Sequence, residues 1–358
     1  MSSVTSDDAG AVLSQAGEAG GLGACLRELV QRTFGERVLQ IEGGAGPLFS
    51  LDYDERLFRH NYAHPVLVSA AQGAGPKVAA ALATGRHDAV GMDLVAQCAN
   101  EVLTVGAEPL FFLDCVAMGE PDPQVVQQFV GGVAAGCKQA GCALLGGRTV
   151  QAPGRHGKGG YDAAGFVVGV CESRRLVTGR KIRAGDVLVG LPSDGLHAGG
   201  YAVAQRVLLD QAGMHWRDAL SRFGIERTVG EELVRPARMY VRAVRAVLRH
   251  YTIKQVVAGI SPVKDGGLCG AIMRLLPADC AAEVDSKSWR PLPIFDAVQQ
   301  LGRIPADRMH HIFNMGIGLV LMVAPFYAES VVAQLRREGE EPLVIGRVVE
   351  GPRQVTVS

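Results

Sequence analysis

Glycine-rich turns that follow apolar segments constrain this chain more than any other feature of its sequence. Of its 358 residues, 46 are glycine, which is about twice the usual share. The glycines cluster at 43–46, 73–75, 146–147 and 195–200 without a regular period, so they indicate tight turns and close backbone approaches, not a collagen-like chain. None of the clusters forms a P-loop or a dinucleotide-binding GxGxxG motif. Several such turns together favour a phosphate site lined by backbone amides.

Apolar runs that predict strands alternate with segments whose apolar residues recur at helical spacing, which is typical of a mixed α+β protein. We expect a flexible N-terminal arm and first helix at 1–40, an N-terminal domain at 41–174 and a C-terminal domain at 175–358. Residues 109–117 are so apolar that we expect a buried strand there. The other expected strands are 64–70, 142–147, 163–172, 251–261, 317–325 and 342–350, and the expected helices are 25–40, 88–105, 122–140, 201–213, 231–250, 294–302 and 327–338.

Composition excludes several classes of protein. Lysine plus arginine and aspartate plus glutamate both number 36, and such a balance argues against a chain that mainly neutralises nucleic-acid phosphates. No apolar run reaches 18 residues, and the first residues lack the features of a secretory signal. The eight cysteines contain no CxxC pair, which fits reduced thiols. We therefore expect a cytoplasmic protein whose partners include neither nucleic acid nor a membrane.

The sequence surroundings of three side chains suit the binding of a ligand or a metal. Asp93 lies in the apolar sequence VGMDLV, where an unpaired carboxylate is costly, so we expect a partner, a metal or a ligand beside it. Glu101 follows on the same predicted helix, and one or two carboxylates commonly bind Mg²⁺ with a nucleotide. His197 lies between glycines in SDGLHAGGY, open to a ligand as general acid–base or phosphate contact. The plainer alternatives are a solvated helix face for the carboxylates and a structural role for the histidine.

Several long motifs, in order and at matching spacing, resemble the aminoimidazole ribonucleotide synthetase family, also called phosphoribosylformylglycinamidine cyclo-ligase. The resemblance covers about residues 41 to 351. Its strongest parts are GMDLVAQCANEVLTVGAEPLFFLDCVAMG at 91–119, GCKQAGCALLGGRT at 136–149, YDAAGFVVGV at 161–170, GDVLVGLPSDGLHAGGYAVAQRVL at 185–208, LVRPARMYVRAV at 233–244 and FNMGIGLVLMV at 313–323.

The resemblance implies an α+β, two-domain synthetase fold and a homodimer. The N-terminal domains would pair across the dimer into a strand-rich barrel, with a mixed α+β C-terminal domain beside it. The implied reaction is the ATP-dependent closure of formylglycinamidine ribonucleotide, a phosphorylated ribonucleotide substrate, to aminoimidazole ribonucleotide in purine biosynthesis. ATP and Mg²⁺ are the implied cofactors. Transfer of a phosphoryl group to the amide oxygen makes that oxygen a leaving group, and the protein mainly supplies positioning and charge neutralisation.

The resemblance also implies roles for particular residues. Lys77 and His197 would be catalytic, and Asp93 and Glu101 would bind the metal. Residues that would bind the nucleotide are Gly73, Gly75, Lys77, Asp93, Gly146, Gly147, Arg148 and Thr149.

Among the departures from the family pattern, two change the charge of the expected nucleotide and metal site. The family loop SGTDGVGTK reads SAAQGAGPK here, with Gln72 at the acidic position, and the family's GGET has Arg148 in place of glutamate. These changes make the expected metal site more positive, so Mg²⁺ affinity should fall. Another carboxylate, such as Asp114 or Asp162, could compensate for them. A catalytically degraded paralogue that acts as a binding or regulatory protein is therefore the alternative, and another ATP-using member of the wider superfamily is a third reading.

Overall fold

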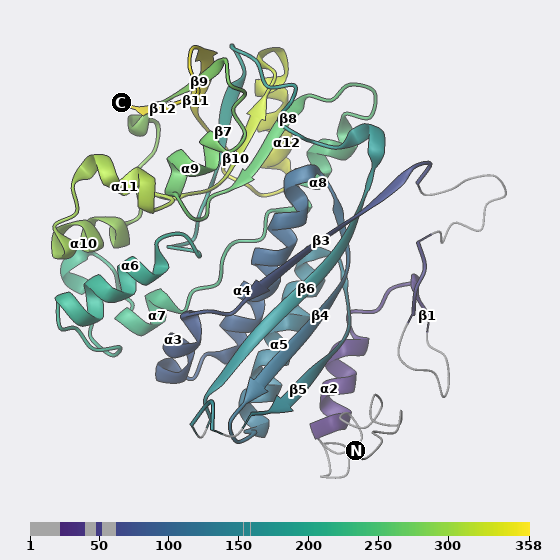
Figure 1. The fold of residues 1–358 in the computed structure, drawn as a ribbon, viewed down its shortest axis with the longest axis vertical. Coiled ribbons are helices and arrows are strands. Elements are labelled where there is room, and N and C mark those ends of the chain that lie inside the picture. Colours follow the sequence, from purple (N-terminus) through teal and green to yellow (C-terminus); the bar gives the residue numbers. More distant parts are fainter. Residues whose placement is uncertain (1–21, 40–47, 52–61, 153, 158) are drawn as a thin grey trace, which may run out of the picture.

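The computed structural model describes residues 22–39, 48–51, 62–152, 154–157 and 159–358, which form the expected mixed α+β fold (Figure 1). A four-stranded sheet precedes residue 175 and a six-stranded sheet follows it. The glycine cluster at 43–46 and residues 1–21 of the expected arm lie outside the described residues. The proposed boundary at 174/175 separates the two sheets in sequence, but one apolar core includes residues from both sides of it, from Ala70 to Leu335.

The N-terminal sheet confirms the four strands expected before residue 175. It consists of β3 (Pro65–Gly73), β4 (Glu108–Met118), β5 (Ala143–Gln151) and β6 (Tyr161–Glu172), in the order β3-β6-β4-β5. The pairs β3/β6 and β6/β4 are antiparallel. Strands β4 and β5 are parallel, as a helical crossover between consecutive strands requires.

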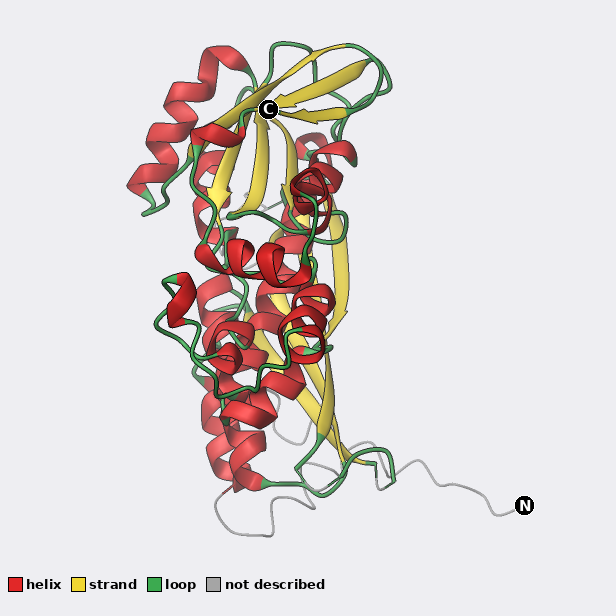
Figure 2. Cartoon of the chain, turned by 90° about the vertical axis from the view of Figure 1, so that its left-hand side faces the viewer, coloured by secondary structure: helices red, strands yellow, loops and turns green. Residues whose placement is uncertain are grey.

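Helices cover one face of this sheet, as Figure 2 shows. They are α2 (Leu22–Gln31), α3 (Lys77–Thr84), α4 (His87–Val102) and α5 (Pro123–Ala140). The Asp122 carboxylate caps α5 by accepting from the backbone N–H of Gln124 at 2.9 Å. Helices α4 and α5 pack at very short distance because Gly132 has no side chain. A Cβ there would overlap the carbonyl oxygen of Asp88 on α4.

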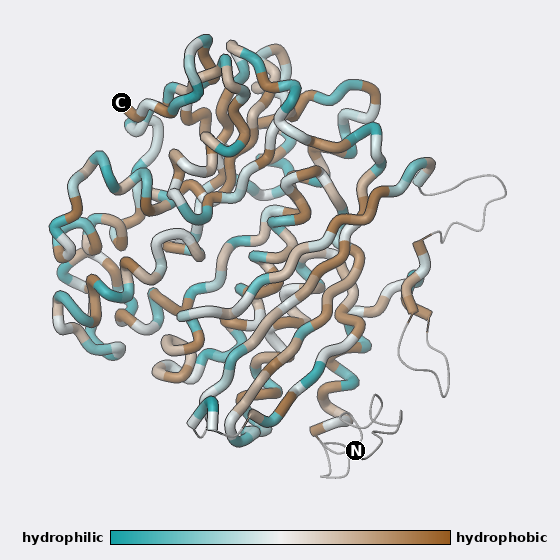
Figure 3. The backbone as a smooth tube through the Cα atoms, viewed as in Figure 1, coloured by the Kyte–Doolittle hydropathy of each residue, from teal (hydrophilic) through white to brown (hydrophobic). Residues whose placement is uncertain are grey.

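The other face of the N-terminal sheet is open and apolar. Leu67 on β3 is 59% exposed, and Leu113, Val150 and Phe166 on the other three strands are also exposed. The expectation that 109–117 forms a buried strand is therefore wrong for Leu113 and Cys115, whose side chains are exposed. Successive residues of a strand point to opposite faces, so an apolar run cannot by itself show that both faces are covered. Figure 3 shows the apolar character of these strands.

Two strands of the C-terminal sheet are fully buried, and others are partly exposed. Its strands are β7 (Val187–Pro192), β8 (Val257–Pro262), β9 (Cys280–Val284), β10 (Ile317–Val323), β11 (Leu343–Glu350) and β12 (Val355–Val357), in the order β12-β9-β11-β7-β10-β8. Every residue of β10 and of β8 is buried, as continuous apolar runs predict, whereas β11 and β12 are partly exposed. Around this sheet lie α9 (Gly267–Met273), α10 (Pro293–Gly302), α11 (Ala306–Ile312) and α12 (Ala328–Arg337).

Two predicted helices are wrong in extent. The helix expected at 25–40 ends at Gln31, and the short strand β1 (Val38–Leu39) follows and pairs with β2 (Leu48–Phe49). The helix expected at 231–250 divides into α7 (Val229–Leu233) and α8 (Val241–His250). Pro236 explains this break, because proline has no N–H to donate and disfavours helical geometry in the residue before it.

The remaining helix and the cysteines follow the sequence more closely. The segment expected as a helix at 201–213 contains α6 (Tyr201–Gln205) and a π-helical stretch over Arg206–Gln211. All eight cysteines are free, and six of them are buried. Within the described residues, helices long and apolar enough to cross a membrane are absent.

Candidate functional site

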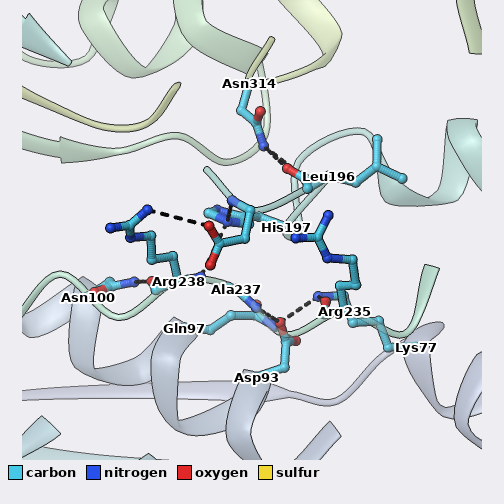
Figure 4. Close-up of polar contacts among 12 residues, drawn as sticks. Lys77, Asp93, Gln97, Asn100, Leu196, His197, Arg235, Ala237, Arg238 and Asn314 are labelled. Carbon is cyan, nitrogen blue, oxygen red and sulfur yellow. Dashed lines mark hydrogen bonds and ion pairs between the residues drawn. The ribbon is translucent and has the colours of Figure 1, made fainter. Parts of the chain in front are cut away.

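Two polar side chains on one face of α4, Asp93 and Asn100, bind the irregular segment 234–240, which joins α7 to α8. Gln97 lies between them on the same face, since the spacings are four and three residues, and it binds Asp93. Figure 4 shows Asp93 and Asn100 beside the backbone of this segment. A segment without helical hydrogen bonds needs other partners for its buried backbone groups, and α4 provides them.

Lys77 and Asp93 form a buried ion pair. The Lys77 Nζ lies 2.5 Å from Asp93 Oδ1, and the two side chains are 4% and 1% exposed. Asp93 also accepts from Gln97 Nε2 at 2.6 Å and from the backbone N–H of Ala237 at 2.7 Å. Lys77 Nζ donates in addition to the carbonyl of Arg235 at 2.9 Å. The sequence left a partner, a metal or a ligand open for Asp93, and in the structure this carboxylate has a partner.

Asn100, two turns further along α4, binds the same segment through two hydrogen bonds to its main chain. Its Nδ2 donates to the carbonyl of Arg238 at 2.8 Å, and its Oδ1 accepts from the backbone N–H of Tyr240 at 3.1 Å. The Tyr240 hydroxyl donates in turn to the carbonyl of Pro192 at the end of β7. A continuous chain of hydrogen bonds therefore runs from the N-terminal helix layer to the C-terminal sheet.

His197 occupies the glycine-rich turn after β7, where it is buried and has a positive φ of 56°. Its Nε2 accepts from the backbone N–H of Arg238 at 3.3 Å and of Asp194 at 3.4 Å. Burial, with the nearby charges of Lys77, Arg235 and Arg238, lowers the pKa of His197 to about 3. The ring is therefore neutral at pH 7, and it connects the turn to the irregular segment by accepting hydrogen bonds.

A cavity of about 330 Å³ lies beside these contacts. It brings the two predicted glycine-rich turns together, because residues 73–77 line one side and residues 198–203 line the other. The helices α3 and α6 both begin at its wall, so their N-terminal backbone amides and positive dipole ends lie next to the cavity. Gly75 has a φ of 58°, a conformation that other residues adopt only with strain. This arrangement suits a phosphoryl group.

Some of the residues predicted to form the site line this cavity, and others lie outside its lining. Gly73, Gly75 and Lys77 line it, together with Gln97 and Asp265. Asp93 lies behind Lys77, in contact with its ammonium group. His197 precedes the lining residue Ala198 and is itself buried.

The carboxylates expected to bind a metal do not fit that task in this structure. Asp93 is committed to Lys77, and Glu101 forms an ion pair with Lys264. A lysine ammonium beside each carboxylate opposes the binding of a divalent cation. In the described part of the chain, no group of three or more His, Cys, Asp or Glu side chains could hold a metal ion.

The predicted residues Gly146, Gly147, Arg148 and Thr149 lie on β5, away from the cavity lining. Arg148 is in register with Cys115, Ala164 and Gly73 across the sheet, on the open face. Three strand spacings separate it from Gly73, about 14 Å.

Gly147 lies opposite Asp114 on the covered face of the sheet. A Cβ at Gly147 would overlap the Asp114 carboxylate. Burial raises the pKa of Asp114 to about 7. Gln72 lies in the same cross-strand row as Asp114, with Gly165 of β6 between them. The proposed compensation by Asp114 would thus act across two strand spacings, about 10 Å.

Sequence reasoning missed three residues that organise the site. Gln97 contacts Asp93 and lines the cavity. Lys264 pairs with Glu101. Asn314, which is fully buried, accepts from Ser193 Oγ and donates to the carbonyls of Gly195 and Leu196, and so shapes the turn before His197. The available signal for Asn314 was a polar residue between Phe313 and the apolar strand at 317–325.

Two family models match the chain: AIR synthase related protein, N-terminal domain, over residues 59–171, and AIR synthase related protein, C-terminal domain, over residues 183–358. The chain is also similar to phosphoribosylformylglycinamidine cyclo-ligase of Geobacillus thermodenitrificans, with 43% identity over 328 residues, 92% of this chain and 91% of that protein. The protein of the same name from Brevibacillus brevis is 41% identical over 330 residues, 92% of each.

Solved structures with the same fold include thiamine-monophosphate kinase from Stenotrophomonas maltophilia, with a TM-score of 0.67 and 18% identity over 95% of this chain and 96% of that one. Hydrogenase maturation protein HypE in complex with ATP matches with a TM-score of 0.62 and 15% identity over 95% of this chain and 92% of that one. At such identities the likeness shows a shared fold alone.

Proposed function

We propose that this chain, which belongs to the AIR synthase related protein family, is a phosphoribosylformylglycinamidine cyclo-ligase. The reaction is the ATP-dependent closure of formylglycinamidine ribonucleotide to aminoimidazole ribonucleotide. The similarity to the cyclo-ligases at 43% identity over 92% of the chain carries this proposal. The cavity between the two glycine-rich turns supports it, because both reactants bear phosphates.

In this reaction the protein mainly positions the reactants and neutralises phosphoryl charge, and it depends less on a reactive side chain. An amide oxygen is a poor leaving group, and phosphoryl transfer from ATP to that oxygen converts it into phosphate. The amidine nitrogen then attacks the activated carbon, and the imidazole ring closes. In such a reaction, alignment of the reactants and neutralisation of phosphoryl charge supply most of the rate enhancement.

We assign the binding of a phosphate to the cavity between residues 73–77 and 198–203. Gly73 and Gly75 let a phosphate approach the backbone, and the N-terminal ends of α3 and α6 favour its charge. Lys77 adds a positive charge at the wall, held in place by Asp93. His197 holds the turn of residues 194–200 against Arg238 through the two hydrogen bonds that its Nε2 accepts. In this proposal the histidine acts by position and does not transfer a proton.

ATP use follows from the proposed reaction, and the fold is shared with a protein solved in complex with ATP. We derive no step through Mg²⁺, because the ion pairs of Asp93 and Glu101 leave no suitable set of oxygen ligands in this structure.

We also propose that the chain is a homodimer that covers the open face of the N-terminal sheet. Leu67, Leu113, Val150 and Phe166 present a large apolar area on that face. Contiguous apolar surfaces of this kind mark interfaces between proteins. Pairing of two such sheets face to face would give the barrel that the family resemblance implies.

The test is substrate-dependent release of ADP by the purified protein with formylglycinamidine ribonucleotide, ATP and Mg²⁺, against a blank without the ribonucleotide. Gly75→Ala should lower this turnover at least tenfold, since the alanine strains a turn that lines the cavity. Gly85→Ala is the matched control, because Gly85 also has a positive φ, of 73°, and follows the same helix outside the cavity. Release of ADP that does not depend on the ribonucleotide would refute the proposed reaction.

A further inference from the structure

A second and larger cavity, of about 850 Å³, lies far from the first. Its walls are the residues before β3, the end of β6 with the segment 172–181, and the end of α8 with the segment 251–256. His64 of this cavity and Gly73 of the first lie at opposite ends of β3. Nine residue steps of a strand separate them by about 30 Å. The two cavities are therefore distinct sites.

Positive charge concentrates in this second cavity although the chain as a whole is neutral. Six lysine or arginine side chains and two carboxylates line it, a surplus of four positive charges at neutral histidine. The first cavity has one lysine and one aspartate in its lining and no such surplus. The basic residues of the second cavity are Arg174, Arg175, Lys181, Arg245, Arg249 and Lys254.

Both carboxylates of the second cavity are already committed to protein groups. Glu108 contacts three guanidinium groups, those of Arg37, Arg245 and Arg249. Glu172 accepts from the backbone N–H groups of Ala63 at 2.9 Å and His64 at 3.0 Å. Within the lining, Glu108 is shared by the guanidinium groups of Arg245 and Arg249, so positive charge remains in excess there, and a further anion would neutralise it.

Two arginines of the lining have donors to spare. The side chain of Arg245 is only 17% exposed, and its Nε is a buried donor that has no acceptor among the described residues. Burial lowers the pKa of Arg245, and the neighbouring charge of Arg249 lowers it further. Arg174 is exposed, and no hydrogen bond from its side chain to a described residue is present. Buried donors are almost always satisfied in folded proteins, so the unpaired Arg245 Nε shows that acceptors are scarce around this basic cavity.

Aromatic side chains complete the lining. Tyr62 and Tyr251 both face this cavity, and Tyr251 packs edge-on against Tyr327 with ring centroids 5.6 Å apart. Lys254 lies over the Tyr327 ring at 5.2 Å. Cations beside aromatic rings form a surface that can hold a phosphoryl group and an apolar or aromatic body together.

We propose that the cavity between residues 62–64, 172–181 and 245–256 is a second ligand site, which binds a phosphorylated small molecule with an aromatic body, such as a nucleotide. Arg174, Arg245 and Arg249 bind the phosphoryl oxygens, and Tyr251 packs against the aromatic body. The site does not depend on the function proposed for the first cavity. A solvated basic surface would need neither a cavity nor a buried guanidinium nitrogen without an acceptor.

The experiment uses inorganic pyrophosphate as the probe on the full chain, with binding measured by calorimetry at one ionic strength and located by amide hydrogen exchange. We expect slower exchange in residues 172–181 and 248–256 when pyrophosphate binds. The double variant Arg174→Ala/Arg249→Ala should weaken this binding at least tenfold. Both side chains are exposed, so the variant should fold normally. Arg242→Ala is the matched control, because Arg242 lies on the same helix as Arg249, is 81% exposed and is outside the cavity lining.

Three outcomes would overturn the proposal: no measurable binding, binding that the double variant leaves unchanged, or protection confined to residues 73–77 and 198–203. The last outcome would place the phosphate in the first cavity. The aromatic part has its own test. Tyr251→Leu should reduce the protection of residues 248–256 by ADP and leave that by pyrophosphate unchanged, and equal effects on both ligands would refute it.

Discussion

Acid should destabilise this protein through one buried histidine. The pKa of His197 is lowered to about 3 in the folded chain, whereas an unfolded chain binds the proton near the ordinary value of about 6.5. Between these two values the unfolded state binds more protons than the folded state, so the free energy of unfolding falls as the pH falls. The free energy of unfolding begins to fall below about pH 6.5 and continues to fall towards pH 3, and this effect is absent above about pH 6.5.

The magnitude follows from the same shift. Each pKa unit corresponds to about 1.4 kcal/mol, so lowering the pH from 7.5 to 5.0 should cost about 2 kcal/mol through His197 alone. Because the imidazole accepts from two backbone N–H groups and is buried, protonation would remove an acceptor and place a charge in an apolar site.

The assay is urea unfolding at pH 7.5 and pH 5.0 at one protein concentration. His197→Asn is the informative variant, because asparagine tolerates the positive φ of 56° at this position. Wild type should lose about 2 kcal/mol more than this variant between the two pH values, because only wild type carries the buried imidazole. His64→Asn, which changes an exposed histidine, should behave as wild type. Equal losses in wild type and His197→Asn would refute the reasoning.

Three further predictions concern packing, charge and assembly. Lys77→Met should destabilise the chain by about 3–5 kcal/mol, because it leaves a buried carboxylate unpaired, and addition of Asp93→Asn should restore part of that loss in the same urea assay. Gly131→Ala should stabilise α5 by about 0.5–1 kcal/mol, because a Cβ there meets open space. Gly132→Ala should lower the melting temperature, because its Cβ would overlap α4. Similar melting temperatures for the two variants would contradict the close packing of α4 and α5. Leu113→Asp on the open sheet face should convert a dimer into a folded monomer in sedimentation velocity, and a dimer that persists would place the interface elsewhere.

The order of strands and helices could be predicted from the sequence because it depends on local patterns. Continuous apolar runs predicted β3 and β4, helical spacing of apolar residues predicted α4 and α5, and the structure confirms all four. The open face of β4 could not be predicted in the same way, since an apolar side chain looks the same in sequence whether the chain itself or another molecule covers it. The helix expected at 231–250 is interrupted around Pro236, a residue whose local geometry disfavours a continuous helix.

The site was harder to predict because its pairings are non-local. The apolar surroundings of Asp93 correctly indicated that the carboxylate needs a partner, but Lys77 lies 16 positions away on another helix. The pairing of Glu101 with Lys264 spans 163 positions. Sequence spacing along α4 carries no information about either lysine. The positions carried over from the family resemblance, including Arg148, therefore needed the fold before their neighbours could be known.

The contact between α4 and the segment 234–240 has a consequence for how freely this chain can vary. Asp93 and Asn100 bind the main chain of that segment, at the N–H of Ala237, the carbonyl of Arg238 and the N–H of Tyr240. Main-chain groups are the same for almost every amino acid, so the hydrogen bond at position 237 does not depend on the identity of the side chain there, although the burial of Ala237 limits the size of that side chain. Proline is the exception, because it removes the N–H. For these three main-chain contacts the sequence information thus lies in α4, at Asp93 and Asn100, and the bound segment is less constrained by them than the helix is.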